Sequence, residues 1–131
     1  MMRYLFDASA IFATLKPENI RKLSGNYTTE LAKYEVGNII WKERALHKRM
    51  NEKEQEELLD LAANALKTMQ ILKLDGHENS VLRLATEIRD TFYDASYVHF
   101  AEAMSVPLVT GDGKLSKRIG GRIAVRDVSE I

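Results

Sequence analysis

Residues 4–10 read Tyr-Leu-Phe-Asp-Ala-Ser-Ala, and this stretch introduces the pattern that the rest of the chain repeats. A short apolar run ends at Asp7, and helical spacing follows from Ala8 to Leu15, shortly before Pro17. The stretch therefore predicts a strand, a turn and a helix, with Asp7 at the carboxyl end of the strand.

Outward from this stretch, strand and helix patterns alternate along the chain. Short strands are predicted near residues 27–28, 71–74, 107–109 and 123–125, and helices near residues 29–49, 51–69, 81–88, 93–104 and 114–119. Strands and helices that alternate at this spacing form βαβ units. The sequence thus predicts an α/β fold, with a three-layer α/β/α arrangement around a mainly parallel central sheet. Because no linker or repeat interrupts residues 1–131, a single domain is expected.

Capping residues mark the start of two helices. Thr28 or Thr29 is expected to cap the long helix that runs to about Arg49. Asn51 and Glu54 form a capping-box pattern, which predicts the start of the following helix.

Composition narrows the possible functions. The 131 residues are 45% apolar, enough for one sizeable core, and 29% charged, with a formal net charge of zero. Contacts with nucleic acid must therefore be local. The absence of cysteine excludes disulfides, zinc–thiolate sites and cysteine nucleophiles. Because Asp7 interrupts the apolar N-terminus and no apolar run approaches the ~18 residues of a membrane span, a soluble, cytoplasmic protein without membrane contact is expected.

Four acidic residues occupy positions typical of a site. Asp7 and Asp112 directly follow short apolar strands, which places them at the carboxyl edge of the sheet, where open α/β folds form their binding crevice. Glu35 and Asp94 lie in predicted helices, and Glu35 stands beside an apolar stripe rather than on the solvated face. A carboxylate in that position needs a partner.

Clustered carboxylates predict a particular chemistry. Several carboxylates close together are unfavourable unless they are protonated or bind a hard divalent ion such as Mg²⁺ or Mn²⁺. Such an ion can activate water for phosphodiester hydrolysis. A purely structural alternative stays open at this point, because Asp7, Asp94 and Asp112 each precede helical sequence and each alone is consistent with an N-cap. Glu35 is likewise consistent with a simple ion pair to a nearby lysine.

Four motifs follow one another in an order that is specific when taken together. They are residues 4–10, Tyr-Glu-Val-Gly-Asn at 34–38, Tyr-Asp-Ala-Ser-Tyr at 93–97 and Leu-Val-Thr-Gly-Asp at 108–112. In these motifs the chain resembles the PIN-domain family and, more narrowly, the VapC toxins of type II prokaryotic toxin–antitoxin pairs. The resemblance covers essentially the whole chain. It implies a metal-dependent endoribonuclease that hydrolyses RNA with metal-activated water.

The resemblance also implies roles for individual residues. Asp7, Glu35 and Asp94 match metal-binding acids, and Asp112 matches a fourth acid that completes the pocket and its Mg²⁺ or Mn²⁺ site. Residues expected to hydrogen-bond these carboxylates and orient them are Ser9, Thr110 and, more weakly matched, Asn38. Asp90 lies close to Asp94 in sequence and remains an alternative ligand, although Asp94 fits the motif better.

Two groups of basic residues are predicted to flank the acids. One group ends the long helix and includes Lys42, where stabilisation of the helix C-terminus is an alternative explanation. The other follows Asp112, and its members Lys114, Lys117 and Arg118 are predicted to bind the RNA backbone. The resemblance further implies a homodimer and a cognate antitoxin protein whose segment lies across the acidic groove.

The sequence is compatible with three alternative functions. The same pocket would serve a PIN nuclease of RNA maturation without a toxin role. A catalytically silent PIN module would keep the fold without binding metal, although all four acids are present here. A phosphoryl-accepting receiver domain fits less well, because it requires paired acids after its first strand and only Asp7 stands there.

Overall fold

The computed structural model describes residues 2–131, which form a five-stranded sheet with all neighbouring strands parallel. The strand order is β3-β2-β1-β4-β5. The strands are β1 (Leu5–Phe6), β2 (Tyr27–Thr29), β3 (Gln70–Leu72), β4 (Leu108–Val109) and β5 (Val125–Arg126). The predicted parallel sheet is therefore confirmed, with β1 at its centre.

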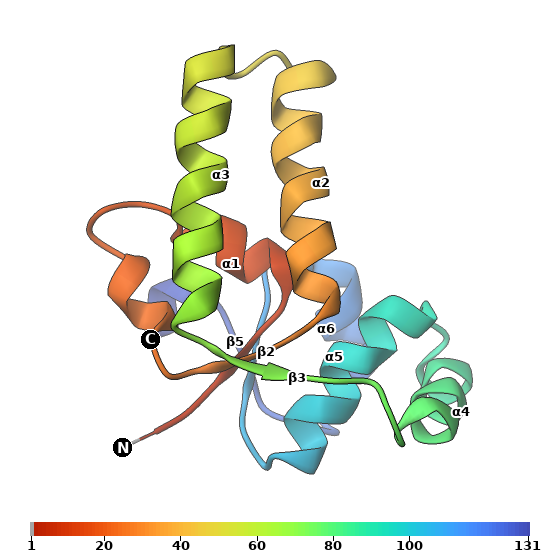
Figure 1. Cartoon of the computed structure of the whole chain (residues 1–131). Helices are drawn as coiled ribbons and strands as arrows, with labels where there is room; N and C mark the ends of the chain where they lie inside the picture. The colour runs from red at the N-terminus through yellow and green to blue at the C-terminus, as the bar shows by residue number, and fades with distance from the viewer. Residues whose placement is uncertain (1) are drawn as a thin grey trace.

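Helices cover both faces of the sheet. They are α1 (Ala8–Thr14), α2 (Leu31–Ala45), α3 (Glu52–Lys67), α4 (Glu78–Ile88), α5 (Phe92–Ala103) and α6 (Gly113–Ile119), with short 3-10 helices η1 (Ile20–Leu23) and η2 (Val128–Glu130). Helix α1 packs on α2, and α2 on α3, whereas α4 packs on α5 and α5 contacts β1, β2 and β4. Figure 1 shows α2 and α3 as a tall pair that rises from the sheet, apart from α4 and α5. This is the predicted three-layer α/β/α arrangement.

The register of the central strands brings distant motifs together. Leu5 of β1 pairs with Tyr27 of β2 and with Leu108 of β4, and Phe6 pairs with Val109. Because the strands are parallel, the residues that follow Phe6 and Val109 emerge at the same edge of the sheet. Short strands suffice here because Leu5, Phe6, Leu108 and Val109 are all fully buried. Burial of β1 and β4 thus positions the first and last motifs side by side.

The predicted cap and end of the long helix are wrong. Thr28 and Thr29 belong to β2, and the Thr28 hydroxyl donates a hydrogen bond to the Phe6 carbonyl (2.8 Å), so it is used across the sheet rather than as a cap. Glu30 stands at the N-cap without a side-chain hydrogen bond. The helix ends at Ala45 rather than near Arg49, and Lys48 adopts a positive φ of 52° in the connection to α3.

The predicted capping box of α3 is confirmed and provides a test of local stability. Asn51 Oδ1 accepts from the Glu54 N–H (2.9 Å), and Glu54 Oε1 accepts from the Asn51 N–H (3.1 Å). We expect Asn51→Ala to lower the free energy of unfolding by about 1 kcal/mol, which corresponds to a drop of roughly 3–6 °C in Tm. Thermal unfolding followed by circular dichroism measures it. Asn79→Ala, an exposed position within α4, is the control, and an equal drop there would contradict the capping argument.

None of the helices formed by residues 2–131 combines the length and the apolar composition that a membrane crossing requires.

Candidate active site

Asp7 is held rigidly where β1 meets α1. Its side chain caps α1: Oδ1 accepts from the Ala10 N–H (2.9 Å) and from the Ser9 hydroxyl (2.7 Å). The Thr110 hydroxyl donates to Oδ2. Burial raises the pKa of the Asp7 carboxyl, and the hydrogen bonds from Ser9 and Thr110 partly offset that shift. Asp7 is therefore a buried and oriented carboxyl group that charges only at an energetic cost.

The turn after β4 is fastened to the same cluster. The Gly111 N–H donates to Ser9 Oγ (3.0 Å), and the Asp112 N–H donates to Thr110 Oγ1 (3.0 Å). Asp112 caps α6, because its Oδ1 accepts from two backbone N–H groups of that helix. The hydroxyls of Ser9 and Thr110 thus link the carboxyl ends of β1 and β4, and they orient Asp7 relative to Asp112.

Glu35 and Tyr97 meet across α2 and α5. The Tyr97 hydroxyl donates to Glu35 Oε1 (2.7 Å), and the Tyr97 side chain is buried. Burial raises the pKa of Glu35, while the Tyr97 hydrogen bond acts in the opposite direction. Burial and the contact with Glu35 hold the pKa of Tyr97 well above its usual value, so this phenol stays protonated and donates. Glu35 therefore has one oxygen anchored to the far layer of the fold.

Asp94 has a strongly perturbed carboxyl group. Burial, followed by the neighbouring Asp90, raises the pKa of Asp94 to about 7. Asp90 accepts from the Thr91 N–H (2.7 Å) and pairs with Arg118 (3.4 Å), and its side chain is 4% exposed. Arg118 thus places a positive charge beside Asp90, whereas burial favours the protonated form of Asp94.

All four predicted acids line one pocket of about 200 Å³. Lys42 and Asn38 of α2 line it too, together with Tyr97. The acids come from four separate segments: the β1–α1 junction, α2, α5 and the β4–α6 turn. Asp112 raises the pKa of both Asp7 and Asp94, so their charges interact through the pocket. The structure thus brings together residues that are up to 105 positions apart in the chain, from Asp7 to Asp112.

The N-cap alternative is correct for two of the three aspartates. Asp7 and Asp112 cap α1 and α6, whereas the cap of α5 is Thr91, whose hydroxyl accepts from the Asp94 N–H (3.0 Å). Capping does not remove these groups from the pocket, because each aspartate uses only one of its two carboxylate oxygens, Oδ1, to cap its helix. The Asp94 side chain has no capping role to explain its position.

The oxygen-only donor set of the pocket suits a hard divalent cation. Three of its carboxyl groups have raised pKa values, so each gains when a cation compensates its charge. As the side chains stand, residues 2–131 contain no group of three acids, histidines or cysteines close enough to hold a metal ion ready-made. The acids line the same pocket, but their side chains do not converge closely enough to coordinate one ion as they stand.

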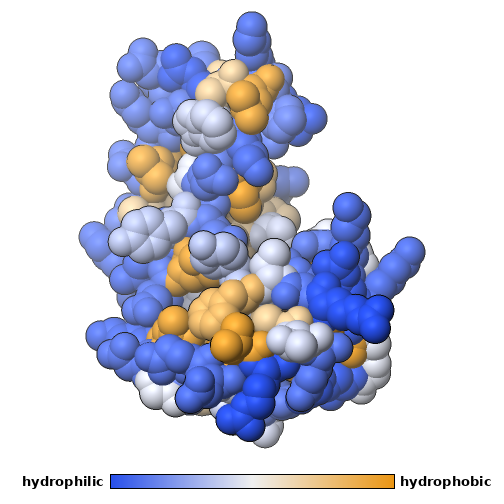
Figure 2. Space-filling model, turned by 90° about the vertical axis from the view of Figure 1, so that its right-hand side faces the viewer, coloured by the Kyte–Doolittle hydropathy of each residue, from blue (hydrophilic) through white to orange (hydrophobic). Residues whose placement is uncertain are grey.

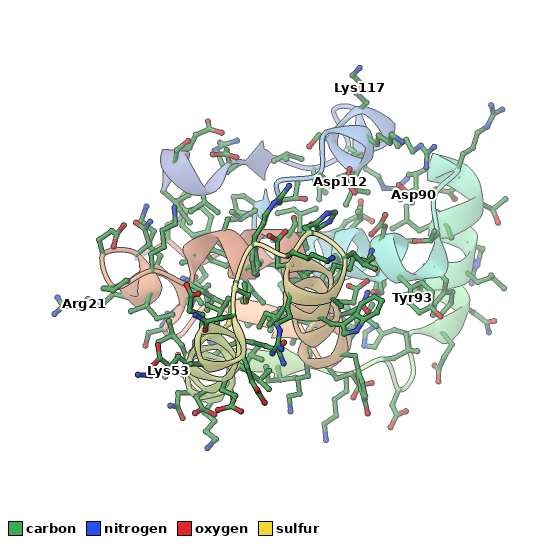
Figure 3. All side chains as sticks on the ribbon, turned by 90° about the horizontal axis from the view of Figure 1, so that it is seen from above. Arg21, Lys53, Asp90, Tyr93, Asp112 and Lys117 are labelled. Atoms are coloured by element: carbon green, nitrogen blue, oxygen red, sulfur yellow. The ribbon has the colours of Figure 1, made fainter. Side chains whose placement is uncertain are left out.

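The predicted basic residues are placed less uniformly. Lys114 and Lys117 are exposed on α6, and Figure 3 shows Lys117 projecting away from Asp112 and Asp90. Arg118 is half-exposed and pairs with Asp90. Lys42, seven residues and two turns after Glu35, is the lysine that lines the pocket.

Tyr97 was missed as a site residue by the motif reasoning. It lies three residues after Asp94, so both side chains share one face of α5 and reach the same pocket. That spacing was visible inside the motif of residues 93–97.

Tyr97→Phe is expected to lower the nuclease activity that the motif resemblance implies by about 10- to 100-fold, the usual loss when a group that orients a metal ligand, here the expected ligand Glu35, is removed. The variant keeps the buried ring and loses only the hydrogen bond to Glu35, so Tm should change little. Steady-state cleavage rates at several Mg²⁺ concentrations measure it. Tyr4→Phe removes a tyrosyl hydroxyl that contacts Met2 and should be silent. Equal rates for the two variants would show that Tyr97 does not orient Glu35.

The fold and this pocket define a three-layer α/β/α domain with an acidic pocket at the carboxyl edge of its parallel sheet. No family model matches the chain. Exonuclease VapC9 of Pyrobaculum aerophilum is 35% identical, over 95% of this chain and 91% of the relative, and Ribonuclease VapC3 of the same organism is 30% identical, over 89% and 95%. The crystal structure of PAE2754 from Pyrobaculum aerophilum matches with a TM-score of 0.80 at 33% identity, covering 98% of this chain and 85% of that one. The chain therefore belongs to the VapC family of PIN-domain nucleases.

Proposed function

We propose that this nuclease is a metal-dependent endoribonuclease whose site is formed by Asp7, Glu35, Asp94 and Asp112. The observation that carries the proposal is the convergence of these four carboxyl groups in one pocket, three of them with raised pKa values. Strongly perturbed acids in a cleft are typical of functional sites. RNA as the substrate is supported by the name of the relative Ribonuclease VapC3.

Mg²⁺ or Mn²⁺ is the proposed cofactor, because both ions prefer oxygen ligands. Bound by the four acids, the ion would supply charge neutralisation at the phosphate and activation of water. Asp7 would offer a carboxylate already aligned by Ser9 and Thr110, and Glu35 one aligned by Tyr97. Asp94 would lose its proton on metal binding, because a nearby cation favours the charged form.

Basic residues would bring the RNA to this acidic pocket. Lys42 lines the pocket and is proposed to contact the phosphate that is cleaved. Lys114, Lys117 and Arg118 of α6 are proposed to contact the backbone beyond it, and Lys117 projects outward from α6. Asn38 is proposed to orient Glu35 or substrate from one turn along α2.

The biological role that we propose is that of a toxin controlled by a cognate antitoxin protein, with the chain acting as a homodimer. Membership of the VapC family supports this role and the homodimer. Growth arrest on expression, relieved by co-expression of a protein from the neighbouring gene, is the expected result. Activity without growth arrest would favour the RNA-maturation alternative.

Cleavage of a panel of structured RNAs by purified, antitoxin-free protein tests the activity. We expect cutting with Mn²⁺ or Mg²⁺ and none with chelator. Because one relative is named an exonuclease, each RNA is supplied in linear and circular form. An endonuclease cuts both forms, whereas an exonuclease leaves the circle intact. No cutting of any RNA, combined with no metal binding by calorimetry, would replace this proposal with the catalytically silent module.

A further inference from the structure

Asp90 is an acidic residue whose side chain lies inside the protein. Figure 2 shows hydrophilic side chains projecting from the surface, both along the tall α2–α3 pair and around the lower part of the molecule. The Asp90 side chain, in contrast, is only 4% exposed. A buried carboxylate costs free energy unless hydrogen bonds or a cation compensate it. The position of Asp90 therefore requires contacts that hold it there.

Two groups hold the Asp90 carboxyl group, and they come from different parts of the chain. Its Oδ1 accepts from the Thr91 N–H (2.7 Å), and its Oδ2 faces Arg118 Nη1 of α6 (3.4 Å). Thr91 is the N-cap of α5, so these contacts connect α6 to the start of α5. Figure 3 shows Asp90 on the same side of the molecule as Asp112, whose side chain caps α6. Asp90 is thus fixed by contacts on both of its oxygens.

The Asp90 carboxyl group supports that of Asp94 from outside the carboxylate pocket. Asp94 follows Asp90 by four residues, and a side-chain hydrogen bond joins them. Asp94 lines the pocket with the other three acids, whereas Asp90 does not line it. A group behind a metal site that hydrogen-bonds a ligating carboxylate fixes the orientation of that ligand. The geometry therefore disfavours Asp90 as an alternative ligand and places it behind Asp94.

We propose that Asp90 is a positioning residue for the proposed metal site, and that Arg118 acts on that site through Asp90. Asp90 restricts the rotation of the Asp94 side chain, so that one carboxyl oxygen stays turned toward the pocket. Arg118 in turn keeps Asp90 in place by its positive charge. The proposal rests on the proposed nuclease function. It gives Arg118 a second role beside RNA contact, which is compatible with a side chain that is 47% exposed.

The Mg²⁺ affinities of Asp90→Ala and Asp90→Asn test the positioning role. Asp90→Ala removes the hydrogen bond to Asp94 and should weaken Mg²⁺ binding about 10- to 100-fold, as removal of a group that orients a metal ligand does. Asp90→Asn keeps an oxygen for the Thr91 N–H and gains an amide that can donate to Asp94, so it should bind Mg²⁺ nearly as tightly as wild type. Calorimetry measures the affinity, and thermal melts in chelator check that each variant folds. Glu87→Ala, which breaks an ion pair with Arg122 away from the pocket, is the matched control.

A double-mutant cycle tests whether Arg118 acts through Asp90. Arg118→Gln should weaken Mg²⁺ binding in the wild-type background and have no further effect in the Asp90→Ala background. An Arg118 that contacts only RNA would instead leave Mg²⁺ binding unchanged, and its loss would raise KM for RNA by the same factor in both backgrounds. That result would overturn the role of Arg118. Lys117→Gln removes a neighbouring cation that projects outward from α6, and it is the control.

The binding and cleavage measurements separate failure of this proposal from failure of the nuclease function. Mg²⁺ binding that Asp90→Ala weakens and Asp90→Asn retains supports the positioning role even if wild type cleaves no RNA. Unchanged Mg²⁺ affinity in Asp90→Ala, with or without a lower Tm, would overturn that role while wild type still cleaves RNA. So would an equal loss of affinity in Asp90→Ala and Asp90→Asn, because the charge of Asp90 and not its hydrogen bond would then set the affinity. No metal binding by wild type would overturn both proposals.

Discussion

Asp7→Asn is expected to abolish RNA cleavage while leaving the fold intact. Asn keeps an oxygen that can cap α1 and accept from the Ala10 N–H, so the local structure should persist. It removes the buried negative charge that the proposed metal requires. The expected loss exceeds about 100-fold, the upper end of what substitution of an orienting residue causes.

Initial cleavage rates with saturating Mn²⁺ measure this effect, and calorimetry measures metal affinity in the same preparation. The control is Asp60→Asn, which removes an exposed carboxylate from α3. Because ionisation of the buried Asp7 costs free energy, the metal-free variant should also melt at or above the wild-type temperature. Wild-type rates from a correctly folded Asp7→Asn protein would refute the assignment of this pocket as the active site.

Asp94→Asn is expected to stabilise the metal-free protein at neutral and alkaline pH. In the folded protein the pKa of Asp94 is raised to about 7, from an ordinary value of 3.8. Between these two values the folded state binds more protons than the unfolded state, so stability falls as pH rises through this interval. Asn has no titratable proton, so the variant does not lose stability in this way as the pH rises. Its amide can also donate to Asp90, which pairs with Arg118.

The difference in Tm between Asp94→Asn and wild type should therefore be small near pH 4 and largest above pH 7. At pH 8 we expect the free energy of unfolding of Asp94→Asn to exceed that of wild type by about 1 kcal/mol. This is well below the free energy that corresponds to the whole pKa shift, because Asp94 is partly exposed and solvent screens its charge. Thermal melts in chelator at several pH values measure the difference. Mg²⁺ at pH 8 should raise the Tm of wild type and not that of Asp94→Asn, by linkage of binding to folding. A Tm difference independent of pH would contradict a raised pKa of Asp94.

Local sequence was sufficient for the elements whose signals lie within a few residues. The strand ending at Asp7, the capping box of Asn51 and Glu54, and the alternation of strands and helices all follow from short-range spacing. The end of α2 was mispredicted because no glycine or proline marks it. The chain instead turns at Lys48, which takes a positive φ that its residue type does not announce.

By itself, the sequence determined the class of fold and the four candidate acids, because Asp7 and Asp112 follow strands of one parallel sheet and therefore lie at its carboxyl edge, and the motifs around Glu35 and Asp94 complete the set. Only the tertiary structure decided how those acids are held. Tyr97 reaches Glu35 across 62 residues, and Arg118 of α6 reaches Asp90, which lies just before α5. These pairings depend on how helices pack across the sheet, and such contacts leave no periodic signal along the chain. The same packing buries the acids and thereby raises their pKa values. The burial of a residue depends on the folded structure around it, so it cannot be deduced from the residue alone.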